Sequence, residues 1–194
     1  MIYMTTSLTL TQGRSTPVRT VRGRTLAAAA AVAAAVAVPQ LFHLLGSLSG
    51  AGASFAQALL PMHLPILLVG LLAGPASGLV AGALGPVVSF ALSGMPAAAL
   101  LPFMVVELAA YGAFAGLLAG VRMPTLAKVL LAQAGGRLAR AGAVLAAAAA
   151  TGDPSLAVSS VWTATVAGLP GLALQWCLLP LLLFWIERQV GRDE

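Results

Sequence analysis

The stretch that decides the fold of this chain runs from Met62 to Gly112 and reads MHLPILLVGLLAGPASGLVAGALGPVVSFALSGMPAAALLPFMVVELAAYG. It is apolar almost throughout, and Gly and Pro interrupt it at close intervals. Its only titratable side chains are His63, Glu107 and Tyr111. Because an unsatisfied polar group in hydrocarbon costs several kcal/mol, these three side chains are the first candidates for a functional site.

The composition of the whole chain predicts an integral membrane protein. Of its 194 residues, 60% are hydrophobic and 8% are charged, whereas a soluble domain carries roughly 25% charged residues. The net charge of +5 does not indicate nucleic-acid binding, because the basic residues lie at the ends of apolar runs and form no patch with aromatic side chains. The single cysteine, Cys177, excludes an intrachain disulfide and a cysteine metal cluster.

The apolar runs predict an all-α fold, an integral membrane bundle of six transmembrane helices, with five or seven helices as alternatives. We expect a flexible basic N-terminal arm at residues 1–24, the membrane domain at residues 25–187 and a cytoplasmic tail at residues 188–194. Turns rich in Gly and Pro separate the predicted spans, which cover residues 25–45, 58–73, 76–92, 98–120, 138–151 and 157–186.

Four of these spans leave alternatives open. The first resembles a signal peptide with Ala35-Val36-Ala37 as the cleavage site, but its apolar run continues to Leu45, which favours a retained helix. The second is too short to cross the hydrocarbon, so we expect it to begin inside the protein or to bend. The fifth can start as early as Leu126, and the sixth can be two segments broken near residues 168–171.

Charge predicts the orientation. With six spans, both termini lie on the same side as the basic segment after the fourth span, which contains Arg122, Lys128, Arg137 and Arg140. The opposite connections, at residues 46–57, 93–97 and 151–155, contain no Lys or Arg. The positive-inside rule then places both termini in the cytoplasm and all ten basic residues on that side of a multi-pass protein of the cell membrane.

On this topology the polar side chains converge on the outer end of the bundle. The candidate substrate-binding residues are His43, His63, Ser89, Glu107, Tyr111 and Trp162. Glu107 and Tyr111 share a helix face with Phe103, so this face offers hydrogen bonding and stacking to one ligand. The alternatives are structural: a hydrogen bond from Tyr111 to Glu107 one turn away, and interfacial positions for the histidines and Trp162.

Other chemistries have weaker support in the sequence. Two imidazoles and a carboxylate, from His43, His63 and Glu107, are adequate zinc ligands, but their spacing matches no known metal signature. We therefore expect no metal and no cofactor. The chain has no Ser-His-Asp order, no phosphate loop and no paired-carboxylate motif, and general acid–base catalysis would have few participants. We expect that the protein is not an enzyme.

Small residues recur at helical spacing in two places. Gly74, Gly78 and Gly82 form one face, which we expect to pack within the bundle. Ala27, Ala31 and Ala35 form another, near the N-terminus. This second face either packs within the bundle or contacts a partner protein, since small residues permit close helix contact in lipid.

The order of motifs in the middle of the chain resembles that of the substrate-binding S components of energy-coupling factor (ECF) transporters. The residues that carry the resemblance are Leu60-Pro61-Met62-His63-Leu64-Pro65, Gly70, Gly74-Pro75, Gly82, Pro86, Ser93-Gly94-Met95-Pro96, Glu107-Leu108 and Tyr111-Gly112. The resemblance extends over residues 25–187 and is strongest over 41–120. After Gly120 only the hydropathy matches.

This resemblance implies six membrane helices that bind a water-soluble vitamin or a related micronutrient near the extracellular side. It also implies a transmembrane coupling subunit, which would contact Ala27, Ala31 and Ala35, and two cytosolic ATPase subunits, which would hydrolyse ATP. The S component is expected to topple in the membrane to release its ligand. The alternatives are a transition-metal uptake subunit and a structural or accessory membrane subunit without a ligand.

Overall fold

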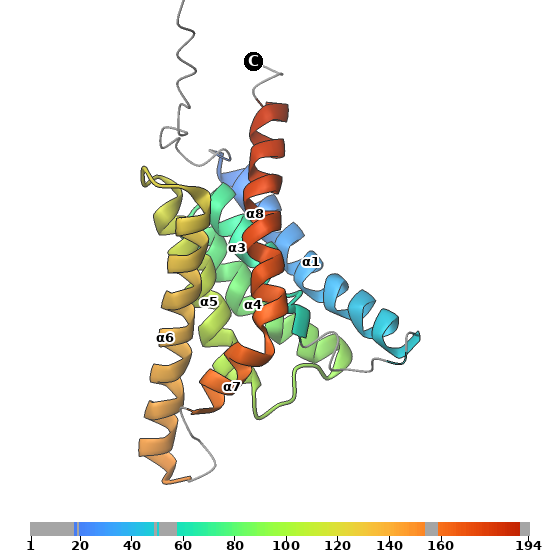
Figure 1. The fold of residues 1–194 in the computed structure, drawn as a ribbon, viewed down its shortest axis with the longest axis vertical. Helices are drawn as coiled ribbons and strands as arrows, with labels where there is room; N and C mark the ends of the chain where they lie inside the picture. The colour runs from blue at the N-terminus through green and yellow to red at the C-terminus, as the bar shows by residue number, and fades with distance from the viewer. Residues whose placement is uncertain (1–17, 19, 49, 51–57, 154–158, 191–194) are drawn as a thin grey trace, which may run out of the picture.

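The computed structural model describes residues 18, 20–48, 50, 58–153 and 159–190. Within these ranges it contains helices and no strand, which confirms the all-α prediction for the described part of the chain (Figure 1). The helices are α1 Val21–Leu48, α3 His63–Ala73, α4 Pro75–Ser93, α5 Leu101–Ala119, α6 Thr125–Thr151, α7 Ser159–Ala167 and α8 Leu169–Val190. Among the described residues, four helical segments are long and apolar enough to cross a membrane: α1, α4, α5 and Leu169–Ile186 of α8.

The helix boundaries differ from the predicted spans at several positions. Helix α1 begins at Val21, inside the predicted arm, of which residues 1–17 and 19 lie outside the described residues. Helix α6 begins at Thr125, close to the earlier of the two predicted starts. The last predicted span is two helices that meet at Gly168, which was the alternative. Its second half, α8, continues to Val190, so part of the predicted tail is helical.

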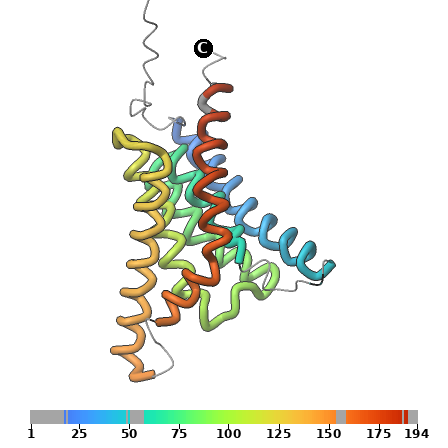
Figure 2. Tube along the Cα trace, in the orientation of Figure 1, coloured from blue at the N-terminus to red at the C-terminus, as the bar shows by residue number. Residues whose placement is uncertain are grey.

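Helix α5 lies at the centre of the bundle. It packs against α3, α4 and α6, while α1 packs against α3 and α4 on one side and α8 packs against α6 and α3 on another (Figures 1 and 2). The start of α1, the turn between α5 and α6 and the end of α8 lie toward the upper end of the view (Figure 1). From there α1 runs away from the bundle, and its last turns stand apart from α6 and α7.

Glycines allow α5 to lie unusually close to its neighbours. A Cβ atom at Gly78 of α4 would overlap the backbone of Gly112 of α5, and one at Gly112 would overlap the backbone of Gly78. Gly70 of α3 approaches the same carbonyl group of Gly112. Because lipid supplies no hydrophobic force between helices, such close backbone contact is a main source of association. The prediction that the Gly face packs within the bundle is confirmed.

Helix α3 is short and buried. Its 11 residues span about 16 Å, and His63 at its first position is only 4% exposed. The chain enters it through a turn at Leu60, which has a positive φ of 47° and accepts a hydrogen bond from the His63 N–H at 3.1 Å. The expectation that this span begins inside the protein is confirmed, and it places an imidazole in the interior.

The alanine face of α1 is used within the chain. Ala31 and Ala35 are buried, and Ala31 packs in one cluster with Val69 and Ala73 of α3 and Ala81 of α4. Ala27 is half-buried at the edge of this cluster. Since these side chains already contact α3 and α4, their contact with a coupling subunit stays a prediction.

Candidate functional site

The site is built around Glu107, whose carboxylate lies in the interior of the bundle. Helix α5 carries Glu107 and Tyr111 one turn apart on its buried face, where they are 1% and 0% exposed. The Tyr111 hydroxyl donates a hydrogen bond of 3.1 Å to Oε1 of Glu107. The hydrogen bond from Tyr111 to Glu107 that the spacing of one turn suggested is therefore present, but it satisfies only one of the acceptor sites of the carboxylate.

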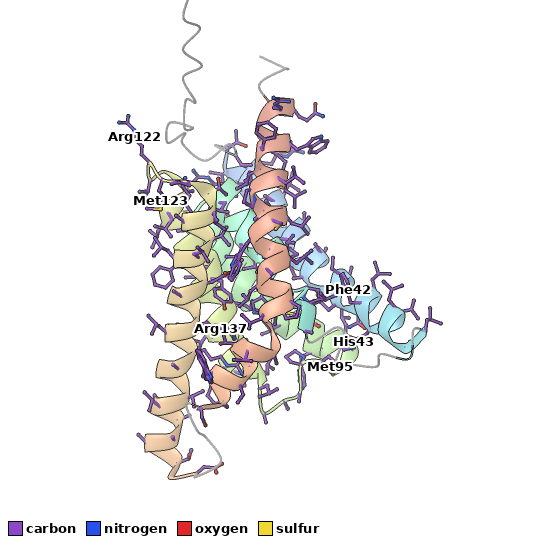
Figure 3. The ribbon with its side chains drawn as sticks, in the orientation of Figure 1. Phe42, His43, Met95, Arg122, Met123 and Arg137 are labelled. Atoms are coloured by element: carbon purple, nitrogen blue, oxygen red, sulfur yellow. The ribbon has the colours of Figure 1, made fainter. Side chains whose placement is uncertain are left out.

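Two arginines of α6 complete the coordination of Glu107. Nη1 of Arg137 lies 2.7 Å from Oε1, and Nη1 of Arg140 lies 2.8 Å from Oε2. We call Glu107, Tyr111, Arg137 and Arg140 the Arg–Glu centre. Figure 3 shows Arg137 on α6, on the side turned toward the other helices.

The structure places Arg137 and Arg140 inside the bundle, beside Glu107. The hydropathy pattern predicted Arg137 and Arg140 in one basic segment with Arg122, which is exposed near the upper end of the view in Figure 3. Their spacing of three residues, in a helix that begins at Thr125, directs both toward α5 instead. The buried carboxylate of Glu107 compensates the cost of withdrawing them from water.

The Arg–Glu centre carries a net charge of +1, and three of its donor nitrogens have no acceptor among the described residues. Nε and Nη2 of Arg137 and Nε of Arg140 are buried and have no hydrogen-bond partner in the described part of the chain. Buried donors of this kind are rare in folded proteins, and each has a cost when it is left unsatisfied. The centre is therefore suited to accept an additional acceptor.

His63 extends the Arg–Glu centre toward α3. Its ring lies 5.2 Å from the Tyr111 ring, centroid to centroid, at an interplanar angle of 58°. Both of its ring nitrogens are buried without a hydrogen-bond partner among the described residues. Since Tyr111 also binds Glu107, a row of polar side chains connects α3, α5 and α6.

The structure brings together three of the six predicted substrate-binding residues: His63, Glu107 and Tyr111. Ser89 is buried on α4, and no described contact joins it to the Arg–Glu centre. His43 is half-buried on the divergent part of α1 and lies across the view from Arg137 (Figure 3). Trp162 is 70% exposed on α7, an orientation that fits an interfacial anchor.

Sequence reasoning missed a second polar group beside the site. Nε2 of Gln133 donates to Oε1 of Gln175 at 2.9 Å, and Nε1 of Trp176 donates to Oε1 of Gln133 at 2.7 Å. Nε2 of Gln175 in turn donates to the carbonyl oxygen of Leu60 at 3.3 Å. This network joins α6 and α8 to the turn before α3. Helical spacing could have identified Gln133, because it lies one turn before Arg137 on the same helix face.

Replacing Gln133 by leucine should destabilise the protein more than a matched surface change. The variant keeps the side-chain volume but removes the partner of the buried Oε1 of Gln175, which costs about 1–3 kcal/mol, and that of the half-buried Nε1 of Trp176. Melting of the detergent-purified protein, followed by tryptophan fluorescence, measures the effect. Gln40→Leu, at an exposed position of α1, is the control. Equal melting temperatures for the two variants would contradict the role of the network.

The contacts of Glu107 weigh against a metal site. Oε1 already accepts from Tyr111 and pairs with Arg137, and Oε2 accepts from Arg140. The described residues contain no group of three His, Cys, Asp or Glu side chains that could hold a metal ion. His43, the third residue considered as a metal ligand, lies on α1, which packs mainly on α3 and α4.

Comparison with known proteins adds no assignment, since no family model, no curated protein and no solved structure matches this chain.

Proposed function

We propose that this chain is the membrane-embedded substrate-capture subunit of an ECF-type importer for a water-soluble vitamin or a related micronutrient. The observation that carries the proposal is the Arg–Glu centre, a buried polar group with unsatisfied donors inside an otherwise apolar bundle. Polar and ionisable side chains at such positions mark binding sites or transport pathways more often than structural contacts.

The arrangement of the resembling motifs supports the same proposal. His63 belongs to the first motif, and Glu107 and Tyr111 belong to the last, yet the three residues are contiguous in the fold. Their chemistry is hydrogen bonding, ion pairing and stacking, which suits reversible capture of a ligand. ATP hydrolysis would be carried out by two cytosolic ATPase partners, joined to this chain through a transmembrane coupling subunit.

The proposed membrane disposition has six crossings, with α7 and α8 acting as one broken span and α3 as a short, inward-starting one. Both ends of the chain and the exposed Arg122 would face the cytoplasm by the positive-inside rule. Helix α6 has 27 residues and a length of about 40 Å, which exceeds a hydrocarbon thickness of about 30 Å. Arg137 and Arg140 flank the middle of this helix, so they would lie at membrane depth.

Identification of a bound small molecule tests this proposal. We expect protein purified from native-like membranes in mild detergent to release one water-soluble compound in near-stoichiometric amount, detected by mass spectrometry. Arg137→Gln should release much less of it, while Trp162→Ala, which changes an exposed side chain, should retain it. Repeated purifications without such a compound, and no thermal shift with any water-soluble vitamin, would refute the capture function.

A structural or accessory membrane subunit is the second candidate. The observation in its favour is that both oxygens of Glu107 are satisfied by the protein itself, as in a centre that only locks α5 to α6. In that case an apolar replacement of the whole Arg–Glu centre would preserve every property of the protein. The same replacement would abolish ligand release if the chain captures a substrate.

A further inference from the structure

The unused donors of the Arg–Glu centre are arranged in a specific way. Each arginine contacts Glu107 through Nη1 alone. In Arg137 the remaining Nε and Nη2 form one complete edge of the planar guanidinium group, and both are buried without a partner in the described chain. Two parallel N–H groups on one guanidinium edge are the fork that binds a carboxylate through both oxygens.

The charge of the centre selects among the possible acceptors. One carboxylate and two guanidinium groups leave a net charge of +1, which a monoanion neutralises at membrane depth. A phosphate monoester carries about −1.5 to −2 at neutral pH and would leave excess negative charge in the interior. A neutral carbonyl would satisfy the donors but leave the charge uncompensated. A monocarboxylate fits both the donor geometry and the charge.

Exposure differs among the charged groups of the centre. The side chains of Arg137 and Arg140 are 13% and 12% exposed, whereas that of Glu107 is 1% exposed. Because Nε and Nη2 of Arg137 and Nε of Arg140 are themselves buried, this exposed area lies on other atoms of the two side chains, and Glu107 is the least accessible group of the centre. The carboxylate of Glu107 stays behind them and holds their positions, so it acts as a positioning residue.

We propose that the Arg–Glu centre binds the carboxylate of a small monoanionic ligand, with the Nε–Nη2 edge of Arg137 as the principal contact and Arg140 as the second. The His63 ring packs on Tyr111, and its two nitrogens are buried without a partner among the described residues. It would contact a polar or planar part of the same ligand. This inference rests on the proposed capture function and deepens it, since it selects carboxylic acids among water-soluble micronutrients.

Chemical rescue of a Glu107→Gln variant provides the first test. The variant raises the charge of the centre to +2 and leaves one of the two Nη1 groups without an acceptor, since the glutamine amide keeps only one oxygen, so added carboxylates should bind there. We expect acetate and benzoate at millimolar concentration to raise its melting temperature more than they raise that of the unchanged protein. Acetamide, benzamide and sodium chloride of equal ionic strength should have no comparable effect. Equal responses to acids and amides would overturn the proposal.

A second test uses the unchanged protein and does not depend on the folding of Glu107→Gln. Pairs of vitamin-type acids and their amides, such as nicotinate with nicotinamide and lipoate with lipoamide, are compared by thermal shift. At least one acid should bind at least about tenfold more tightly than its amide, as charge-assisted bidentate bonds predict. Arg137→Gln should abolish this preference, and Arg122→Gln, which removes an exposed charge at the end of the bundle, should not. An absent preference, or one that survives Arg137→Gln, would overturn the proposal.

The same thermal-shift measurement in nanodiscs distinguishes a free carboxylic acid from a lipid phosphate as the bound anion. Phosphatidylglycerol in place of phosphatidylcholine should not reproduce the stabilisation that the acids give. Stabilisation by phosphatidylglycerol that requires Arg137 would overturn the proposal in favour of a lipid phosphate. Failure of this inference also differs from failure of the proposed function. A neutral co-purifying ligand refutes only the carboxylate, whereas carboxylate binding without any co-purifying ligand refutes only substrate capture.

Discussion

A Glu107→Leu variant is expected to lose most of its folded population, because it leaves two buried guanidinium groups without a counter-charge. Both arginines rely on this one carboxylate, at 2.7 and 2.8 Å. Removing one partner of a buried ion pair destabilises a protein by about 3–5 kcal/mol, which is a large share of the stability of a small domain. The loss arises from the uncompensated arginines and not from the missing contact of Glu107.

The triple variant Glu107→Leu/Arg137→Met/Arg140→Met separates these two causes. Replacing a whole buried ionic group by apolar side chains of similar size is often neutral or stabilising, so the triple variant should regain the folded population that the single variant loses. Size-exclusion profiles and melting curves in detergent measure both effects. A single variant as stable as the unchanged protein, or a triple variant less stable than the single one, would contradict the assigned role of Glu107.

The sequence allowed the fold to be predicted where helix ends are marked by strong local signals. Gly74-Pro75 and Ser93-Gly94 are such signals, and α4 begins and ends within one residue of the predicted span. The late start predicted for the fifth span was wrong because Arg137 and Arg140 look like a cytoplasmic segment in a hydropathy pattern. The hydropathy pattern of one segment contains no information about a carboxylate that another helix places beside it.

The candidate site was predictable in its α3 and α5 parts only. Glu107, Tyr111 and His63 were found because titratable side chains are conspicuous in an apolar run. Arg137, Arg140 and Gln133 were missed as site residues because their chemistry depends on facing α5 and α8 across the bundle. His43 and Trp162 were included on depth alone. Depth does not reveal that α1 diverges from the bundle or that Trp162 points outward.

Replacing Gly112 by valine should prevent formation of a compact bundle, although valine is intrinsically the better helix former. Glycine costs a helix about 1 kcal/mol relative to alanine, so propensity alone predicts a gain on substitution. The packing predicts the opposite result, because a Cβ at this position would overlap the backbone of Gly78, and backbone cannot move aside as a flexible side chain can. Overpacking costs about 1–3 kcal/mol in ordinary cores and more where helix axes must separate.

The position of Gly112 makes this separation especially damaging. The three atoms nearest to a Cβ at Gly112 all belong to Gly78, so α4 would be displaced from α5 directly beside Tyr111 of the Arg–Glu centre. A fluorescent-protein fusion followed by size-exclusion chromatography should show loss of the monodisperse peak. Gly142→Val is the matched control, since it makes the same change within helix α6 where a Cβ meets no neighbouring atom. A normal peak for Gly112→Val, or an equal loss for both variants, would show that the close crossing of α4 and α5 does not hold the bundle together.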